Sequence, residues 1–143
     1  MTDADLVRKK LAQIETYVAD LRRLARPEQI GRDVREERFV EHTLQLAIQA
    51  ALDVASHVVS DERLGEPQTN RELFDLLERR GYLTTTLGAT LRSMAGFRNI
   101  LVHGYDDVDL SVVKDILANH LGDLTEFVAA IGAILAERPE RDS

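Results

Sequence analysis

The sequence has no cysteine, few glycines and prolines, and no long hydrophobic segment. Without cysteine, a disulfide framework, a thiolate metal site and a cysteine nucleophile are all excluded. The apolar runs are far shorter than the ~20 residues of a membrane-spanning helix. The first ten residues, MTDADLVRKK, begin with acidic side chains and lack the apolar segment of a signal peptide. We therefore expect a cytoplasmic protein without membrane association, and 143 residues suffice for one domain with its own core.

Lysine is scarce as well, and acidic residues outnumber basic ones. The formal net charge is −7, with 25 acidic residues against 18 basic ones. This balance argues against binding nucleic acid through charge spread over the whole surface, because such proteins are basic. Only Lys9, Lys10 and Lys114 are lysines, so arginine supplies most of the positive charge. Because arginine suits two-point contacts to phosphate or carboxylate, a local anion site remains open.

Apolar residues recur at spacings of three and four, which predicts amphipathic helices. We expect three long helices on three such stripes: Val7, Leu11, Ile14, Val18 and Leu21; Val40, Leu44, Ala47, Ala51, Val54 and Val58; and Val113, Leu117, His120, Leu124, Phe127, Ile131 and Ile134. The third stripe follows Asp109 and Ser111, either of which can cap the start of its helix.

Two further helices are expected between the second and third stripes. Thr69 or Asn70 can cap a short helix over 71–80, and Gly81 is placed to end it. A fourth long helix is expected over 86–103, followed by another glycine. The expected fold is therefore all-α, an antiparallel bundle of four long helices plus a short one.

We find no repeat, low-complexity tract or linker long enough to divide the chain. The sequence thus predicts a single domain over 1–143, with a core at about 3–138 and a short polar tail at 139–143.

The helix expected over 86–103 is apolar on nearly all sides, which is typical of helices buried in a core or a subunit interface. At about 100° per residue, five apolar residues share one face: Leu87, Leu91, Met94, Leu101 and Val102. Phe97 and Ile100 fall on other sides. Arg98 lies in the middle of the shared face, where an unpaired charge is costly. Arg98 therefore needs a partner or a water-filled cleft, and Asp53 on the preceding long helix is one candidate partner.

Four polar residues come together in sequence at the end of this helix: Arg98, Asn99, His103 and Tyr105. Asn99 and His103 are four residues apart and share a helix face. Arg98 and His103 are about 140° apart on an ideal helix. They can meet in two ways: the helix unwinds at Gly104 and swings the imidazole, or two copies of the helix meet across a dimer axis.

These residue types suit phosphodiester chemistry. Histidine exchanges protons near neutral pH, and arginine holds a phosphate at two points and stabilises charge that grows in a transition state. RNA supplies its own nucleophile, the 2′-hydroxyl, so no metal or other cofactor is needed. The structural alternatives are a buried ion pair with a capping histidine for Arg98 and His103, backbone capping for Asn99, and packing for Tyr105.

The remaining histidines carry weaker signals. His57 follows the second stripe and can approach the helix over 86–103, although a hydrogen-bonded structural role is the simpler interpretation. We retain Asp53 and His57 as residues that can support the site. His42 is expected at the surface and His120 in the core or an interface. No histidine has a glutamate three residues before it and no H-E-x-x-H occurs, so no metal site is expected.

The pattern R-N-x-x-x-H-x-Y, formed by Arg98, Asn99, His103 and Tyr105, resembles the HEPN motif of HepT-type toxins. The similarity extends along nearly the whole chain, through four stretches: 46–57 (LAIQAALDVASH), 94–103 (MAGFRNILVH), 108–109 (VD) and 120–124 (HLGDL). In an all-α chain of this length, the full pattern is far more specific than the spacing of arginine and histidine alone.

The resemblance implies a HEPN domain and a metal-independent endoribonuclease toxin that cleaves RNA in a cleft formed across a homodimer. Arg98 would clamp the phosphate, His103 would be the general acid or base, and Asn99 would support them. It also implies an antitoxin partner, a small MntA-type nucleotidyltransferase that transfers AMP to Tyr105. A local surface can attract RNA to this acidic protein: Arg32, Arg35 and Arg38.

Two other interpretations stay open at this point. One is a non-catalytic module that binds a nucleotide or a partner and serves a separate nucleotidyltransferase. The other is a plain helical adaptor. Growth arrest on expression without the partner favours the nuclease, whereas tight binding of ATP or AMP without RNA cleavage favours the module.

Overall fold

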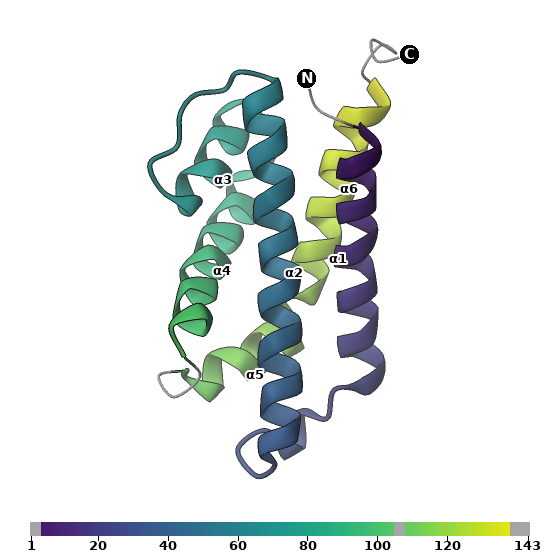
Figure 1. Ribbon diagram of the computed structural model, residues 1–143, viewed down its shortest axis with the longest axis vertical. Helices are drawn as coiled ribbons and strands as arrows, with labels where there is room; N and C mark the ends of the chain where they lie inside the picture. The colour runs from purple at the N-terminus through teal and green to yellow at the C-terminus, as the bar shows by residue number, and fades with distance from the viewer. Residues whose placement is uncertain (1–3, 105–107, 138–143) are drawn as a thin grey trace.

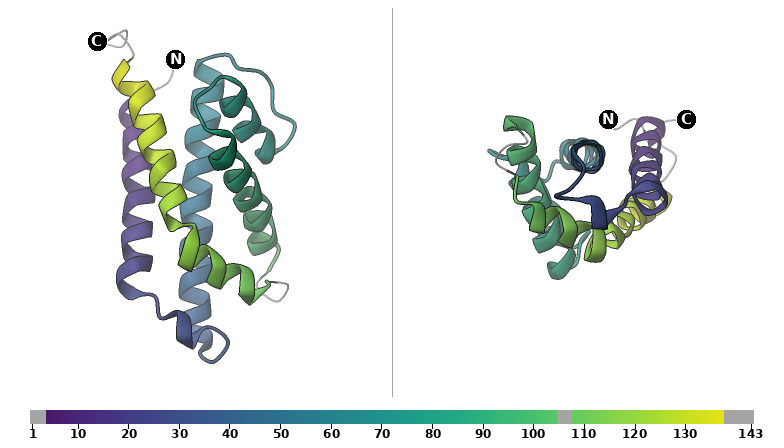
Figure 2. Two further views of the ribbon diagram at one scale, coloured as in Figure 1. Left: turned by 180° about the vertical axis from the view of Figure 1, so that it is seen from behind. Right: turned by 90° about the horizontal axis from the view of Figure 1, so that it is seen from below.

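The computed structural model describes residues 4–104 and 108–137, and all regular structure in these ranges is helical. The elements are α1 (Ala4–Leu24), the 3-10 helix η1 (Pro27–Gln29), α2 (Val34–Asp61), α3 (Asn70–Arg79), α4 (Thr85–His103), α5 (Leu110–Asn119) and α6 (Leu121–Glu137). In the elongated antiparallel bundle, α2 runs between α1 and α4, and α3 packs against α4 (Figure 1). Seen from behind, α6 lies between α1 and α4 (Figure 2). Within the described ranges, no helix has the length and apolar character needed to cross a membrane.

The predicted apolar stripes form the core. Every residue of the stripes on α1 and α2 is at most 5% exposed. On α6, the Phe127 ring is fully buried and packs edge-on against Phe74 of α3, with ring centroids 5.9 Å apart. Full burial of one large apolar side chain contributes roughly 1.5–3 kcal/mol. The stripes therefore form a large part of the buried apolar core, and the expected all-α bundle is confirmed.

The predicted caps are confirmed as well. Thr69 accepts a hydrogen bond from the Glu72 amide at the start of α3, and Gly81 follows the end of α3 with φ +86°. Asp109 accepts from the Ser111 amide at the start of α5. These side chains satisfy amide groups that a helix start leaves without a partner, and Gly81 adopts a backbone conformation that other residues avoid.

The single long helix expected over 113–134 is wrong. The chain leaves helical geometry at His120 (φ −126°, ψ 1°), which separates α5 from α6. The two ring nitrogens of His120 hold the junction: Nδ1 lies 2.8 Å from Asp123 of α6 and Nε2 lies 3.2 Å from Asp115 of α5. The apolar spacing continues across this break, so periodicity alone does not reveal it. The described bundle has six α-helices rather than five.

Candidate functional site

The motif-bearing helix α4 is fixed in place by ion pairs with α3. Glu78 of α3 approaches α4 at Gly88, where a Cβ would overlap with the Glu78 carboxylate. One turn further along α4, Arg92 donates a hydrogen bond to Glu78 Oε1 at 2.7 Å and lies 3.1 Å from Asp75 Oδ1. The hydrogen bond to Glu78 is the main cause that raises the pKa of Arg92 above its ordinary value. These contacts set the rotation of α4 and hence the side on which each motif residue lies.

Arg98 lies half-buried in the α4 face that packs on the core. Its Nη1 donates a hydrogen bond to Asn99 Oδ1 at 3.2 Å. Its Nε is buried and has no hydrogen-bond partner within residues 4–104 and 108–137. Leaving such a donor unpaired costs about 1–3 kcal/mol. The Arg98 guanidinium therefore has a donor that no described residue uses.

The expected ion pair between Asp53 and Arg98 is wrong, because Asp53 is engaged elsewhere. Asp53 Oδ2 lies 3.3 Å from Lys10 Nζ of α1, and Asp53 Oδ1 accepts a hydrogen bond from Gln49 at 2.9 Å. These contacts place the Asp53 carboxylate on the side of α2 that faces α1, whereas α4 packs on another side (Figure 1).

His57 is half-buried and lies four residues before the end of α2. That end of α2 is at the opposite end of the bundle from the C-terminal end of α4, which carries His103 (Figure 1). The structure therefore does not bring His57 to the motif. His42 is exposed, as expected, and both ring nitrogens of the half-buried His120 have partners, as expected of a structural histidine.

His103 is the last residue of α4 and is exposed. The helix stays regular through His103, and Gly104, at φ +134°, ends it. The helix therefore does not unwind before His103 to carry the imidazole toward Arg98. Tyr105 lies outside the described residues, so its part in the site stays a prediction.

The exposed apolar residues of α4 gather next to His103. Ile100 and Val102 have 44% and 46% of their surface exposed. Val102 is thus exposed in the single chain, whereas the other residues of the predicted apolar face are buried: Leu87, Leu91, Met94 and Leu101. Phe97, expected on another side, is buried at 7% exposure. The end of α4 thus presents a histidine between two uncovered aliphatic side chains.

A cavity of about 230 Å³ lies on the Phe97 side of α4. Its lining residues come from three elements: Thr90, Ser93, Met94 and Phe97 of α4, Val112, Asp115 and Ile116 of α5, and His120. No pattern in the sequence indicates this cavity, because its lining residues on α5 and His120 are positioned by the break that makes α5 a separate helix. Neither Arg98 nor His103 lines it.

Sequence reasoning also missed Arg71 of α3. The Arg71 guanidinium lies over Gly96 of α4, with its Cζ and Nη1 3.8 Å from where a Gly96 Cβ would be. Arg71 is exposed and has no hydrogen bond or ion pair with other described residues. Its signal in the sequence is weak: it shares a helix face with Asp75 and Glu78, which contact α4.

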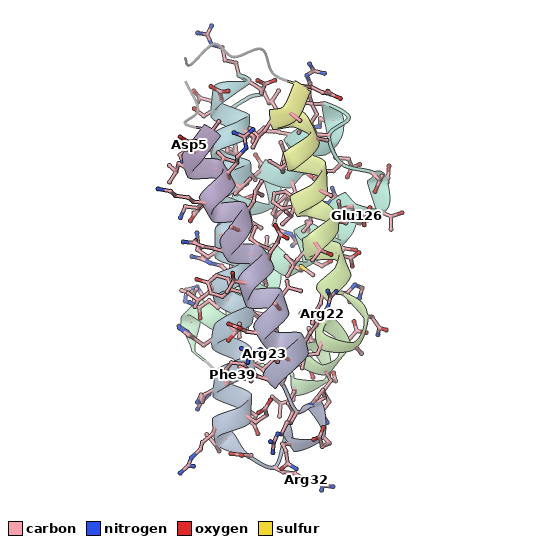
Figure 3. The ribbon with its side chains drawn as sticks, turned by 90° about the vertical axis from the view of Figure 1, so that its right-hand side faces the viewer. Asp5, Arg22, Arg23, Arg32, Phe39 and Glu126 are labelled. Carbon is pink, nitrogen blue, oxygen red and sulfur yellow. The ribbon has the colours of Figure 1, made fainter. Side chains whose placement is uncertain are left out.

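The three arginines of the expected RNA-attracting surface lie at the N-terminal end of α2. Arg32 is exposed at the lower tip of the molecule (Figure 3), and Arg35 is exposed in the first turn of α2. Arg38 lies 3.5 Å from Glu41, a buried side chain whose pKa is raised mainly by that burial. This tip and the C-terminal end of α4 are toward the same end of the bundle (Figure 1). Attraction of RNA by this surface stays a prediction.

No group of three or more histidine and acidic side chains able to hold a metal ion occurs in the part of the chain that the structure describes. On α4, His103 offers an exposed imidazole, and Arg98 offers a guanidinium whose Nε has no partner among the described residues. The two side chains lie on different sides of the helix.

Comparison with known proteins assigns the chain to a family. The model of the family described as ribonuclease HepT-like matches residues 10–131. This range contains both Arg98 and His103 and covers most of the chain. The chain therefore belongs to the HepT-like ribonuclease family.

Curated relatives and solved structures agree with this assignment. The chain is 31% identical to the mRNA nuclease HepT of Shewanella oneidensis over 130 residues, which are 90% of this chain and 98% of the relative. It is 33% identical to the tRNA nuclease HepT of Aphanizomenon flos-aquae over 107 residues, 75% of this chain and 73% of the relative. The solved structure of the tri-AMPylated Shewanella oneidensis HEPN toxin in complex with an MNT antitoxin superposes with a TM-score of 0.85 at 30% identity. That superposition covers 92% of this chain and 99% of the solved chain.

Proposed function

We propose that this protein is the ribonuclease toxin of a toxin–antitoxin pair and that it cleaves RNA without a metal through Arg98 and His103. One observation carries the proposal: the buried Arg98 Nε has no partner among the described residues, on the same helix that exposes His103 at its end. The nuclease names of both curated relatives support the same function.

In the proposed reaction the RNA 2′-hydroxyl attacks the adjacent phosphorus, the bond from phosphorus to O5′ breaks, and a 2′,3′-cyclic phosphate forms. His103 accepts the proton of the 2′-hydroxyl as general base and then donates it to the departing O5′ as general acid. Arg98 holds the phosphate and stabilises the negative charge that grows in the transition state. Asn99 supports this role because its side-chain oxygen accepts from Arg98 Nη1 and so orients the guanidinium.

We further infer that the active unit is a homodimer formed through the end of α4. Within one chain, Arg98 and His103 lie on different sides of a helix that is regular through His103. A second copy of α4 can supply the missing residue across a two-fold axis. The uncovered Ile100 and Val102 beside His103 are the apolar surface that such an interface would bury.

We propose that the ribonuclease activity is inhibited by AMP transfer to Tyr105, which a nucleotidyltransferase antitoxin catalyses. The complex of the AMPylated Shewanella toxin with its MNT antitoxin supports this inference. An adenylyl group adds bulk and negative charge, and near Arg98 it would occupy the position of the RNA phosphate. A higher-order complex of toxin dimer and antitoxin is compatible with this scheme.

The test is RNA cleavage by the purified protein in EDTA, comparing wild type with Arg98→Ala, His103→Ala and, as a matched control, His42→Ala at an exposed position on α2. We expect wild type and His42→Ala to cut, and the two motif variants to fail while keeping their helical circular dichroism. Equal cutting by all four proteins would contradict the proposal. If wild type binds AMP but leaves RNA intact and its intact mass shows no added AMP, the protein is the non-catalytic nucleotide-binding module instead.

A further inference from the structure

We propose that Arg71 of α3 is a second phosphate-binding residue, which holds an RNA phosphate next to the one that is cleaved. This inference rests on the proposed ribonuclease function and extends it. No part of the HEPN-like pattern includes α3, so the case for Arg71 depends on how α3 and α4 pack.

Three charged residues of α3 face α4 in a ladder. Arg71, Asp75 and Glu78 are spaced by four and three residues and therefore share one helix face. Glu78 meets α4 at Gly88, Asp75 meets it at Arg92, and Arg71 meets it at Gly96. The order shows that the two helices run antiparallel and that Arg71 is at the end of the ladder nearest the motif.

Both carboxylates of this ladder pair with the same arginine, which is not Arg71. Asp75 is four residues after Arg71 and would be its natural ion-pair partner, but Asp75 and Glu78 both bind Arg92. Arg71 is left exposed, without a hydrogen bond or ion pair among the described residues. Its guanidinium faces Gly96, with Cζ and Nη1 3.8 Å from where a Gly96 Cβ would be, and Gly96 itself has no side chain.

The position of Arg71 relative to the motif fits a neighbouring phosphate. Gly96, Asn99 and His103 are spaced by three and four residues and lie on one side of α4. Gly96 and His103 are separated by about 10 Å along the helix axis. The Arg71 guanidinium therefore lies over a position about two helical turns before His103, and an extended RNA strand along this side of α4 would bring another phosphate to Arg71. An exposed guanidinium whose donors have no partner within residues 4–104 and 108–137 suits that contact.

The experiment measures binding of a short single-stranded RNA by fluorescence anisotropy over a salt series, using the His103→Ala background. Arg71→Gln is compared with Arg8→Gln, which removes the same charge from an exposed position on α1, on the other side of α2 (Figure 1). We expect Arg71→Gln to weaken binding roughly threefold to tenfold and to lower the slope of log affinity against log salt by about 0.7. Arg8→Gln should leave the slope unchanged.

Equal effects of the two variants, or no effect of Arg71→Gln, would overturn the assignment. A second measurement excludes an indirect role through the α3–α4 packing: Arg71→Gln should raise KM for an RNA oligonucleotide without lowering kcat, and should not affect a dinucleotide, which has only the scissile phosphate. A loss of activity on the dinucleotide would also overturn it. If wild type cleaves no RNA while the binding result holds, the proposed nuclease function fails and the phosphate contact stands.

Discussion

Replacing Arg98 with methionine is expected to stabilise the fold while abolishing RNA cleavage. Methionine keeps the unbranched, flexible stem of arginine and fits among the apolar neighbours of the buried α4 face. It also removes the buried Nε that has no partner among the described residues. The stability of the protein and its activity should therefore change in opposite directions.

The size of the stability change follows from two terms. Removing an unpaired buried donor gains about 1–3 kcal/mol, and losing the hydrogen bond from Arg98 Nη1 to Asn99 costs about 0.5–1.5 kcal/mol. The expected net gain in the free energy of unfolding is about 1 kcal/mol, which raises the Tm of a chain of this size by about 2–4 °C.

The assay is urea and thermal unfolding at one fixed protein concentration, with Arg92→Met as the matched control. Arg92 is also an α4 arginine, but it bonds to both Glu78 and Asp75. Its replacement leaves two facing carboxylates without a partner, so we expect a loss of about 1 kcal/mol, since all three side chains are partly exposed. If Arg98→Met destabilises the protein as much as Arg92→Met does, then Arg98 is a satisfied structural residue and the reasoning is refuted.

Three further predictions concern packing, pH and assembly. Gly88→Ala should push the Glu78 carboxylate away from Arg92 and so be less stable in urea unfolding than Gly96→Ala. Gly96→Ala has room for a Cβ and should gain about 0.5–1 kcal/mol, because alanine is favoured over glycine inside a helix. Equal changes would contradict the close approach at Gly88. Burial raises the pKa of Glu41 above its ordinary value of 4.5, so the contribution of Glu41 to stability falls as pH rises above 4.5. Glu41→Gln should therefore be more stable than wild type at pH 7 but not at pH 4. A gain in stability that is independent of pH would refute this assignment. Val102→Glu should give a monomer by sedimentation velocity and lose cleavage, and an active monomer would disprove the proposed dimer.

Local features of the fold were predictable from the sequence because their causes are local. The stripes on α1 and α2 became buried faces because their spacing matches the helical repeat. Thr69 and Asp109 became caps because a short polar side chain before a helix binds its first free amides. The motif helix was expected to end at Gly104, and it does.

The errors have a common cause in contacts between distant parts of the chain. Asp53 was assigned to Arg98 because both lie on neighbouring helices, but the rotation of α2 turns Asp53 toward Lys10 of α1. At the helix break, the carboxylates of Asp115 and Asp123 both contact the His120 imidazole. Apolar periodicity in the sequence does not indicate such contacts. The placement of Arg71 over Gly96 likewise depends on how α3 docks on α4.

The short stretch of chain between His103 and Tyr105 sets a limit on how far the proposed AMP-accepting tyrosine can be from the motif. Consecutive Cα atoms are about 3.8 Å apart, so the Cα of Tyr105 is within about 7.6 Å of the Cα of His103 in every conformation of the chain. Under the proposed regulation, an adenylyl group on Tyr105 would be tethered beside the proposed cleft at a high effective concentration. Free RNA would compete with a group that cannot diffuse away, and raising the RNA concentration would not restore activity. Inhibition of this kind ends only when the covalent bond is broken.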